Sequence, residues 1–249
     1  MALEIEKRNG FFKTKEIWFA DFPYDVEGCH GVVFMDCKNK VDINGFRCLD
    51  STTLVIDLSQ DLDAIWNNMK QKSCRYPINR AIKEKVQVRT DQDYGEFHEI
   101  NRNFRRWKGL SLRGFSLKYF ETLKKYSVLF TARLDGEIMA GQLYLEDKDN
   151  IRLLLAASKR SEVDREQATL VGCANRLMIW EAIKYAKEKG IKEFDFGGYY
   201  TGREKDEQKE GVNIFKKSFG GKLTTRYIYR KGYSEIYKLL SFLYFWVPK

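Results

Sequence analysis

The sequence has few of the features that build metal centres and disulfide frameworks. Its five cysteines are an odd number, and none stands in a C-x-x-C pair, so a disulfide framework is not expected. Cys29, His30, Cys37 and Cys48 lie close together in the sequence but lack the regular ligand spacing of a zinc site. We interpret the cysteines as reduced structural thiols and predict no metal site.

The signatures of several enzyme classes and of export are also missing. The chain has no Ser-His-Asp order, no Walker loop and no dinucleotide-binding G-x-G-x-x-G,. Charged residues at Glu4, Glu6, Lys7 and Arg8 interrupt any apolar run of the kind found in a secretory signal,. We therefore expect a cytoplasmic protein.

The most apolar stretch lies at the carboxyl end, between residues 233 and 247. It holds about a dozen apolar residues, whereas a membrane-spanning helix needs about twenty. The stretch predicts a last helix, which either packs on the domain or makes a peripheral contact with an anionic membrane surface.

Acidic residues are outnumbered, with 35 Asp and Glu against 44 Lys and Arg, which gives a net charge of +9. This excess favours polyanionic partners such as tRNA, nucleotide-linked substrates, CoA or an anionic membrane face. The alternative is a basic protein whose charge is spread over a large surface. A hydrophobic content of 43% in 249 residues is enough for one large domain or two small ones,.

The amino-terminal half predicts strands at 16–22, 31–36 and 52–57. Leu62, Ile65, Trp66 and Met69 have helical spacing, which predicts a helix after the third strand with Ser59 as its N-cap,. Pro77 interrupts this helix,.

Two further helices are predicted, over 94–107 and 116–126. In the first, Phe97, Ile100, Phe104 and Trp107 share the face directed at the core, and we interpret His98 as a structural or surface residue,. The second begins at Ser116, a good N-cap,.

From residue 127 the pattern is β-β-β-α-β-α-β. An Asp135-Gly136 turn between alternating segments predicts a hairpin,. The predicted strands are 127–134, 138–146, 151–158, 192–196 and 224–230, and the predicted helices are 166–190 and 212–219,.

Two Gly-Gly pairs mark the last part of this pattern. Gly197-Gly198 ends a strand in which Phe194 and Phe196 point to one side and Asp195 to the other,. Gly220-Gly221 ends a helix whose Val212, Phe215 and Phe219 share one face,. Glycine at such ends permits a left-handed stop and the close approach of a ligand.

The combination D-F-G-G, a polar loop, then G-V-N-I-F-K-K-S-F-G-G resembles the FemABX-like branch of the GNAT acyltransferase superfamily. The resemblance extends to the helix 166–190 and more loosely to residues 52–89. It implies an α+β, GNAT-like fold with a mixed, mostly antiparallel sheet flanked by helices. Residues 116–249 would be the acyltransferase half, with the C-terminal apolar helix, and residues 1–115 a reduced or degenerate second copy.

The resemblance implies an acyltransferase that uses aminoacyl-tRNA as donor and an amine of a phosphorylated cell-wall, glycan or peptide precursor as acceptor, without a separate cofactor. GNAT enzymes that use CoA usually carry a Q/R-x-x-G-x-G/A motif at the start of the long helix, where backbone N–H groups hold the pyrophosphate. Here Arg165 to Gly172 reads R-E-Q-A-T-L-V-G and lacks those glycines. An acyl-CoA-dependent N-acyltransferase and a non-catalytic relative that binds tRNA or precursor are the alternatives.

By the same resemblance, Lys216 stabilises charge in the transfer step. Asp195 is the candidate base or substrate-amine anchor, because it lies at the end of a predicted buried strand beside Gly197-Gly198, where a substrate can come close. The substrate-binding candidates are Phe215, Gly197, Gly198, Tyr199, Arg75, Arg80 and Asn175. Four of these residues have a structural alternative: Lys216 as a solvent-exposed lysine, Asp195 as a partner of loop amides or an arginine, and Arg75 and Arg80 as parts of a solvated basic face.

Overall fold

The computed structural model describes residues 2–202 and 204–239, in two compact units. The first unit comprises Met1–Thr52 and Thr224–Lys249, and the second comprises Thr53–Leu223. Two strands, β4 (Arg47–Asp57) and β10 (Lys222–Gly232), contain residues of both units. The division differs from the predicted boundary after residue 115, because the chain leaves the first unit along β4 and returns along β10. That the amino-terminal region is a degenerate copy stays a prediction.

The first unit is built on β1 (Leu3–Asn9), β2 (Phe12–Trp18), β3 (Gly31–Cys37) and β10. The β1–β2 and β3–β10 pairs are antiparallel, and β2–β3 is parallel. Ile17, Val32, Phe34 and Tyr229 form its core. The sequence analysis did not predict β1, because its charged residues leave little apolar alternation. The five cysteines of the chain are free thiols, as predicted. The described residues contain no cluster suited to a metal ion.

The second unit contains a sheet in the order β4-β9-β8-β7-β6-β5. The β8–β9 pair is parallel and the other pairs are antiparallel, so the prediction of a mixed, mostly antiparallel sheet is confirmed. The strands are β5 (Gln87–Asp91), β6 (Ser127–Leu134), β7 (Glu137–Glu146), β8 (Asn150–Ser158) and β9 (Glu193–Gly198).

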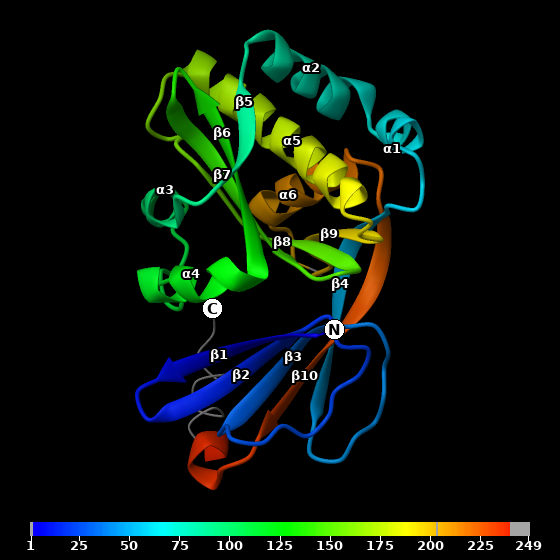
Figure 1. The fold of residues 1–249 in the computed structure, drawn as a ribbon, viewed down its shortest axis with the longest axis vertical. Helices are drawn as coiled ribbons and strands as arrows, with labels where there is room; N and C mark the ends of the chain where they lie inside the picture. The colour runs from blue at the N-terminus through cyan, green and yellow to red at the C-terminus, as the bar shows by residue number, and fades with distance from the viewer. Residues whose placement is uncertain (1, 203, 240–249) are drawn as a thin grey trace. The chain divides into compact units, whose positions relative to one another are not determined.

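Helices cover both faces of this sheet (Figure 1). On β7, Gln142 donates a hydrogen bond to the backbone of Asn175 in α5 (Arg165–Glu188). The preceding residue, Gly141, lies so close to Phe97 of α3 (Tyr94–Trp107) that a Cβ there would be 2.4 Å from the ring. Since adjacent strand residues point to opposite faces, α5 and α3 lie on opposite sides of the sheet.

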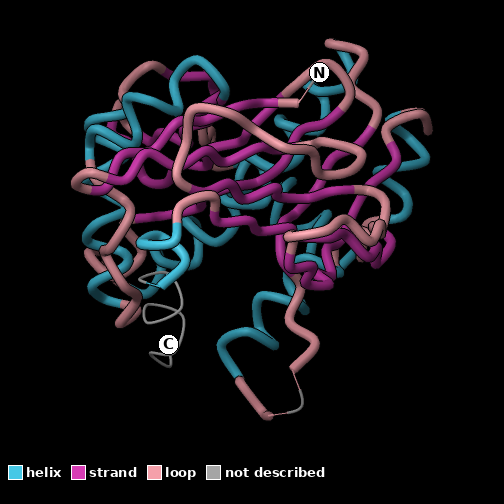
Figure 2. Tube along the Cα trace, turned by 90° about the horizontal axis from the view of Figure 1, so that it is seen from below, coloured by secondary structure: helices cyan, strands magenta, loops and turns pink. Residues whose placement is uncertain are grey.

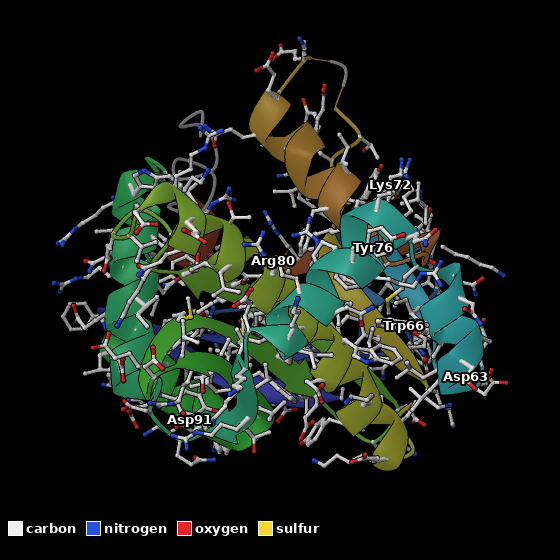
Figure 3. The ribbon with its side chains drawn as sticks, turned by 90° about the horizontal axis from the view of Figure 1, so that it is seen from above. Asp63, Trp66, Lys72, Tyr76, Arg80 and Asp91 are labelled. Carbon is white, nitrogen blue, oxygen red and sulfur yellow. The ribbon has the colours of Figure 1, made fainter. Side chains whose placement is uncertain are left out.

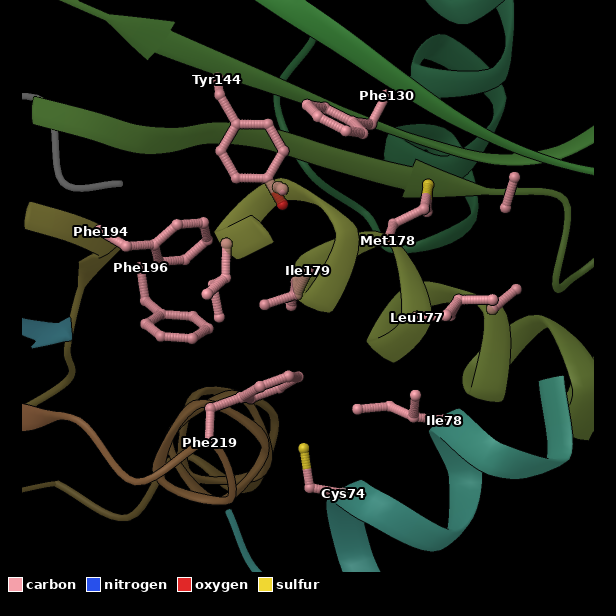
Figure 4. Packing of buried hydrophobic residues seen from close by; sticks show 14 of the residues in the cluster. Cys74, Ile78, Phe130, Tyr144, Leu177, Met178, Ile179, Phe194, Phe196 and Phe219 are labelled. Carbon is pink, nitrogen blue, oxygen red and sulfur yellow. The ribbon is translucent and has the colours of Figure 1, made fainter. Parts of the chain in front are cut away.

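The remaining helices of the second unit complete the two layers. They are α1 (Leu62–Asn68), a π-helix (Gln71–Arg75), α2 (Tyr76–Lys83), α4 (Leu117–Leu123) with a 3-10 turn (Lys124–Tyr126), and α6 (Glu207–Lys217). α2 packs along α5. Figure 4 shows Leu177, Met178 and Ile179 of α5 among the buried side chains of the cluster that also contains Phe194, Phe196 and Phe219.

Several local predictions are corrected by the structure. Asp61, and not Ser59, caps α1, because the Asp61 carboxylate accepts the N–H of Ala64 at 2.6 Å. Pro77 is the second residue of α2, which follows the π-helix Gln71–Arg75 without a gap, so the helix changes its type just before Pro77 and is not interrupted there. Trp107 was expected in the core, but it is 50% exposed because it ends α3.

The predicted C-terminal helix is described only in part. Chain geometry is described up to Leu239, and the rest of the predicted stretch, residues 240–247, lies outside the described residues. Within residues 2–202 and 204–239, no helix is both long enough and apolar enough to cross a membrane.

Candidate active site around the Gly197-Gly198 loop

Strand β9 ends in the first Gly-Gly pair, and its backbone conformation there needs glycine. Gly197 has a φ of +74°, in the left-handed region that L side chains rarely adopt,. A Cβ at Gly197 would also lie 3.0 Å from the carbonyl oxygen of Leu153. Gly198, the next residue, is exposed, so the chain reaches the surface at this point. In Figure 2 the loop between β9 and α6, with the start of α6, extends away from the strands.

Helix α6 turns polar side chains towards this loop. Its buried residues are Asn213 and Lys216, whereas Val212 and Ile214 are 49% and 66% exposed. The predicted face of Val212, Phe215 and Phe219 is therefore only partly buried, since Phe215 is half-buried and Phe219 is buried. The fully buried positions of α6 itself are occupied by an amide and an amine.

Lys216 is buried, with 8% of its surface exposed, so it is not the solvent lysine of the structural alternative. Its Nζ donates to the carbonyl oxygens of Gly198, at 2.5 Å, and of Gly197, at 3.3 Å. An ammonium has three N–H donors. One N–H is therefore left without an acceptor among the residues that the structure describes.

The environment of Lys216 changes its basicity. Burial lowers its pKa from 10.5 to about 8; the nearby Asp195 carboxylate acts in the opposite direction, and the Arg152 guanidinium adds to the lowering,. Near pH 7 the side chain is therefore mostly an ammonium, and well above pH 8 it is mostly a neutral amine. Such a group can donate to a developing negative charge at neutral pH.

Asp195 lies in the middle strand of a buried network. β9 pairs with β8 and β4, and Arg152 and Val55 are the residues opposite Asp195 in the register. One carboxylate oxygen of Asp195 accepts the N–H of Gly197 at 2.7 Å and a hydrogen bond from the Thr53 hydroxyl. The other accepts a hydrogen bond from the Arg152 guanidinium.

With both oxygens engaged, Asp195 has the geometry of the structural alternative. It holds the turn at Gly197 by accepting the backbone N–H of that residue, and it neutralises the buried Arg152,. Its role as a base or amine anchor stays a prediction, and the geometry favours a positioning role.

A second side chain of α6 holds the same loop. The Asn213 amide oxygen accepts the N–H of Tyr200 at 3.0 Å, and its NH₂ group donates to the carbonyl oxygen of Tyr200 at 2.8 Å. Asn213 and Lys216 are three residues apart and so face the same side of the helix. Together they fix the backbone from Gly197 to Tyr200.

Two other predicted substrate-binding residues flank this loop. Phe215 is half-buried, contacts Phe219, and has the Arg176 guanidinium 4.8 Å from its ring centroid. Tyr199 is half-buried and has Lys217 Nζ 5.4 Å from its ring centroid. Both belong to the same local structure as Lys216, and a contact with substrate stays a prediction for each.

The structure does not bring Arg75, Arg80 and Asn175 into this cluster. Arg75 directs Nη1 at Asn67, at 3.4 Å. Arg80 is exposed on α2, where Figure 3 labels it with Tyr76. The Asn175 side chain accepts a hydrogen bond from Gln142 and donates one to the carbonyl oxygen of Val171. Their roles in substrate binding stay predictions.

The start of the long helix α5 is acidic. Asp164 is its N-cap and accepts the N–H of Gln167 at 2.9 Å, and Glu166 lies in the first turn. The carboxylate at the cap therefore occupies a position at which a helix can bind a phosphate.

Three members of the network were missed from the sequence: Thr53, Arg152 and Asn213. Arg152 carried a usable signal, because a charged residue inside the apolar run I-R-L-L-L must be paired if the strand is buried,. Thr53 and Asn213 carried none, since neither residue type is unusual in a strand or an exposed helix.

The first unit contains a separate cavity that the sequence analysis also missed. This cavity has a volume of about 570 Å³. Arg47, Arg230 and Lys231 line the cavity together with Val32 and Leu49. Its described lining residues include no Asp or Glu.

Residues 69–216, more than half of the chain, match the family described as acetyltransferase (GNAT) domain. FemX, a solved structure, is 15% identical, with a TM-score of 0.69 over 96% of this chain and 86% of its own. L-PGS from Bacillus licheniformis is 15% identical, with a TM-score of 0.56 over 100% of this chain and 86% of its own. A conserved protein of unknown function from Bacteroides thetaiotaomicron VPI-5482 is 11% identical, with a TM-score of 0.56 over 92% and 83%.

At these identities the structural similarities concern the fold, and they confirm the predicted GNAT-like α+β architecture of FemX type. No curated protein sequence matches the chain.

Proposed function

The chain belongs to the acetyltransferase (GNAT) family and is an acyltransferase, and from this premise we propose that it transfers an aminoacyl group from aminoacyl-tRNA to an amine. The acceptor in this proposal is a phosphorylated cell-wall or glycan precursor. Three features of the molecule support it: the acidic start of α5, the buried lysine at the Gly197-Gly198 loop, and the basic cavity of the first unit.

The observation that carries the choice of donor is the acidic start of α5. A CoA pyrophosphate bound at a helix N-terminus needs free N–H groups and a positive potential. Here Asp164 takes the N–H of Gln167, and Glu166 adds a second carboxylate in the first turn. The two carboxylates outweigh the single positive charge of Arg165 between them, so a donor without a pyrophosphate at this position suits the helix better.

Lys216 supplies the electrostatic part of the proposed reaction. The acceptor amine attacks the carbonyl carbon of the aminoacyl ester, and negative charge develops on the carbonyl oxygen. The unengaged N–H of the Lys216 ammonium donates to that oxygen, while Gly197 and Gly198 hold the ammonium in place,. The ester C–O bond then breaks, the amide bond is complete, and the proton lost by the amine neutralises the departing ribose oxygen.

Asp195 acts in this scheme through the loop. Its carboxylate holds the N–H of Gly197, and the carbonyl of Gly197 in turn contacts Lys216. The position of the ammonium therefore depends on the Asp195–Arg152 pair even though neither residue needs to touch substrate.

The cavity of the first unit supports a phosphorylated acceptor. Arg47, Arg230 and Lys231 line it beside apolar residues. Arginine forks suit phosphate oxygens, and an apolar wall suits the uncharged part of a precursor. A cell-wall precursor linked to a nucleotide diphosphate has both chemical parts.

The test is a single-turnover transfer assay with two donors and one acceptor. The donors are total tRNA charged with radiolabelled amino acids and labelled acetyl-CoA, and the acceptor is a UDP-linked muropeptide. We expect label to move from tRNA to the muropeptide in the wild type and in Lys209→Met, which removes the same charge from the exposed side of α6. We expect the transfer to be lost in Lys216→Met.

Ligand binding gives a second measurement on the same protein. A ligand present at 100 times its dissociation constant adds about 2.7 kcal/mol to the free energy of unfolding, so acetyl-CoA should leave the unfolding transition unchanged. Stabilisation by acetyl-CoA together with acetylation of the acceptor would overturn the proposed donor and make the chain a CoA-dependent N-acyltransferase.

A further inference from the structure

The end of α3 and the loop after it carry an excess of positive charge, although Arg102 forms an ion pair with Glu99 at 3.2 Å. Between Glu99 and Glu121 the sequence has six basic residues and no Asp or Glu. They are Arg102, Arg105, Arg106, Lys108, Arg113 and Lys118. We call residues 102–118 the basic-apolar surface; it runs from α3 through the loop to the first residues of α4.

Large apolar side chains are exposed on the same stretch. Trp107 is 50% exposed, Leu110 45%, Leu112 39% and Leu117 48%. Single exposed apolar residues are ordinary, but four within eleven positions among cations are not scattered. The placement also contradicts the helical periodicity, which predicted Trp107 in the core.

The loop that presents these side chains has a defined structure of its own. Arg105 Nε donates to the carbonyl oxygen of Ser111 at 2.7 Å, and its guanidinium lies 4.0 Å from the ring centroid of Phe115. His98 Nε2 lies 3.1 Å from the carbonyl oxygen of Phe115, and Ser116 caps α4. These contacts fold the loop back on α3, so the exposed leucines are held at the surface.

We propose that the basic-apolar surface docks on an anionic lipid bilayer. Basic side chains are attracted by the negative surface potential of such a membrane, and tryptophan and leucine gain by entering the boundary between headgroups and acyl chains. Arg106, Lys108 and Lys118 are exposed and supply the charge complementarity. A nucleic acid would satisfy the cations, but aliphatic side chains such as Leu110 and Leu112 gain nothing from a phosphate backbone.

The docking would be peripheral, and it does not depend on which acyl donor the protein uses. It places the membrane contact in the second unit, on residues distinct from the apolar carboxyl-terminal stretch. It also fits an acceptor that is presented at a lipid surface.

The test is co-sedimentation of the full chain with vesicles of phosphatidylcholine alone and of phosphatidylcholine with phosphatidylglycerol. We expect binding to the anionic vesicles only, weakened by salt. Leu110→Ser/Leu112→Ser should reduce the partition coefficient more than tenfold. Arg106→Gln/Lys108→Gln should reduce it about twenty-five-fold, since each basic residue is worth about fivefold.

The matched control is Val212→Ser/Ile214→Ser, which removes two exposed apolar residues of α6 in the same unit and should bind as the wild type does. A second readout is quenching of tryptophan fluorescence by brominated lipid, which should fall in Trp107→Phe. Thermal unfolding of each variant separates lost docking from lost folding.

Three results would overturn the proposal. They are absence of binding to anionic vesicles by the folded wild type, unchanged binding by the folded Leu110→Ser/Leu112→Ser variant, and loss of binding to total tRNA by the variants while vesicle binding is kept. The last result would assign the surface to nucleic acid.

Discussion

Helices α5 and α6 belong to the same unit and bury opposite kinds of side chain. All nine buried residues of α5 are apolar, whereas the two buried residues of α6 are Asn213 and Lys216. α6 also exposes Val212 and Ile214. The packing of α5 follows from the hydrophobic effect alone. Burying an ammonium costs free energy, unlike burying an apolar side chain. Its burial in α6 therefore indicates that this helix is adapted to a function of the Gly197-Gly198 loop.

The largest effect on stability should come from breaking the buried ion pair between Arg152 and Asp195. Asp195→Asn leaves the Arg152 guanidinium buried without its counter-ion, so we expect the free energy of unfolding to fall by about 3–5 kcal/mol. Chemical denaturation measures it. The double variant Arg152→Met/Asp195→Leu should lose less than the single one, and a loss below about 1 kcal/mol in Asp195→Asn would contradict the network.

The same substitution in the two helices sharpens the comparison. Ile179→Ala in α5 removes a fully buried side chain and should cost about 2–5 kcal/mol,. Ile214→Ala in α6 removes one that is 66% exposed and should stay within about 0.5 kcal/mol of the wild type,. Equal losses in the two unfolding curves would show that α6 buries its apolar side after all.

The ammonium of Lys216 should make stability depend on pH in a definite direction. Its folded pKa is about 8 against an ordinary value of 10.5, so between these values the unfolded chain binds a proton that the folded chain does not. The free energy of unfolding should therefore rise with pH in this window, by up to about 1.4 kcal/mol per pH unit relative to Lys216→Met. If the difference in the free energy of unfolding between the two proteins stays constant from pH 7 to 10.5, a lowered pKa of Lys216 is excluded.

A more modest loss of stability than that of the buried ion pair should come from Asn213, which makes two hydrogen bonds to the backbone of Tyr200. Asn213→Ala should cost about 1–2 kcal/mol and speed hydrogen exchange at the Tyr200 amide. Asn103→Ala, at an exposed position of α3, is the control. Unchanged exchange at Tyr200 would mean that Lys216 alone holds the loop.

The contrast between apolar burial in α5 and polar burial in α6 also explains how much of the structure could be predicted from the sequence. The strands β6, β7 and β8 and the helices α3 and α5 agree with their predictions to within two residues at each end, because their apolar periodicity agrees with their burial,. The predicted left-handed stops at the two Gly-Gly pairs are found at Gly197 and Gly220, with φ values of +74° and +86°.

The partners of the predicted site residues could not be read from the sequence. Thr53, Arg152 and Asp195 meet only because β4, β9 and β8 are neighbours in the sheet, and strand order is a property of the whole fold. The burial of Asn213 and Lys216 in α6 could not be predicted for another reason. Hydrophobic periodicity assigns a lysine to the solvent-exposed side of a helix.

The most direct test of the account compares Lys216→Met with the wild type in two measurements on the same preparation. We predict that the single-turnover rate of aminoacyl transfer falls at least about a hundredfold, while the free energy of unfolding at pH 7 stays within about 1 kcal/mol of the wild type or rises. A folded variant that keeps its rate within a factor of three would contradict the account, because Lys216 would then only clamp the Gly197-Gly198 loop.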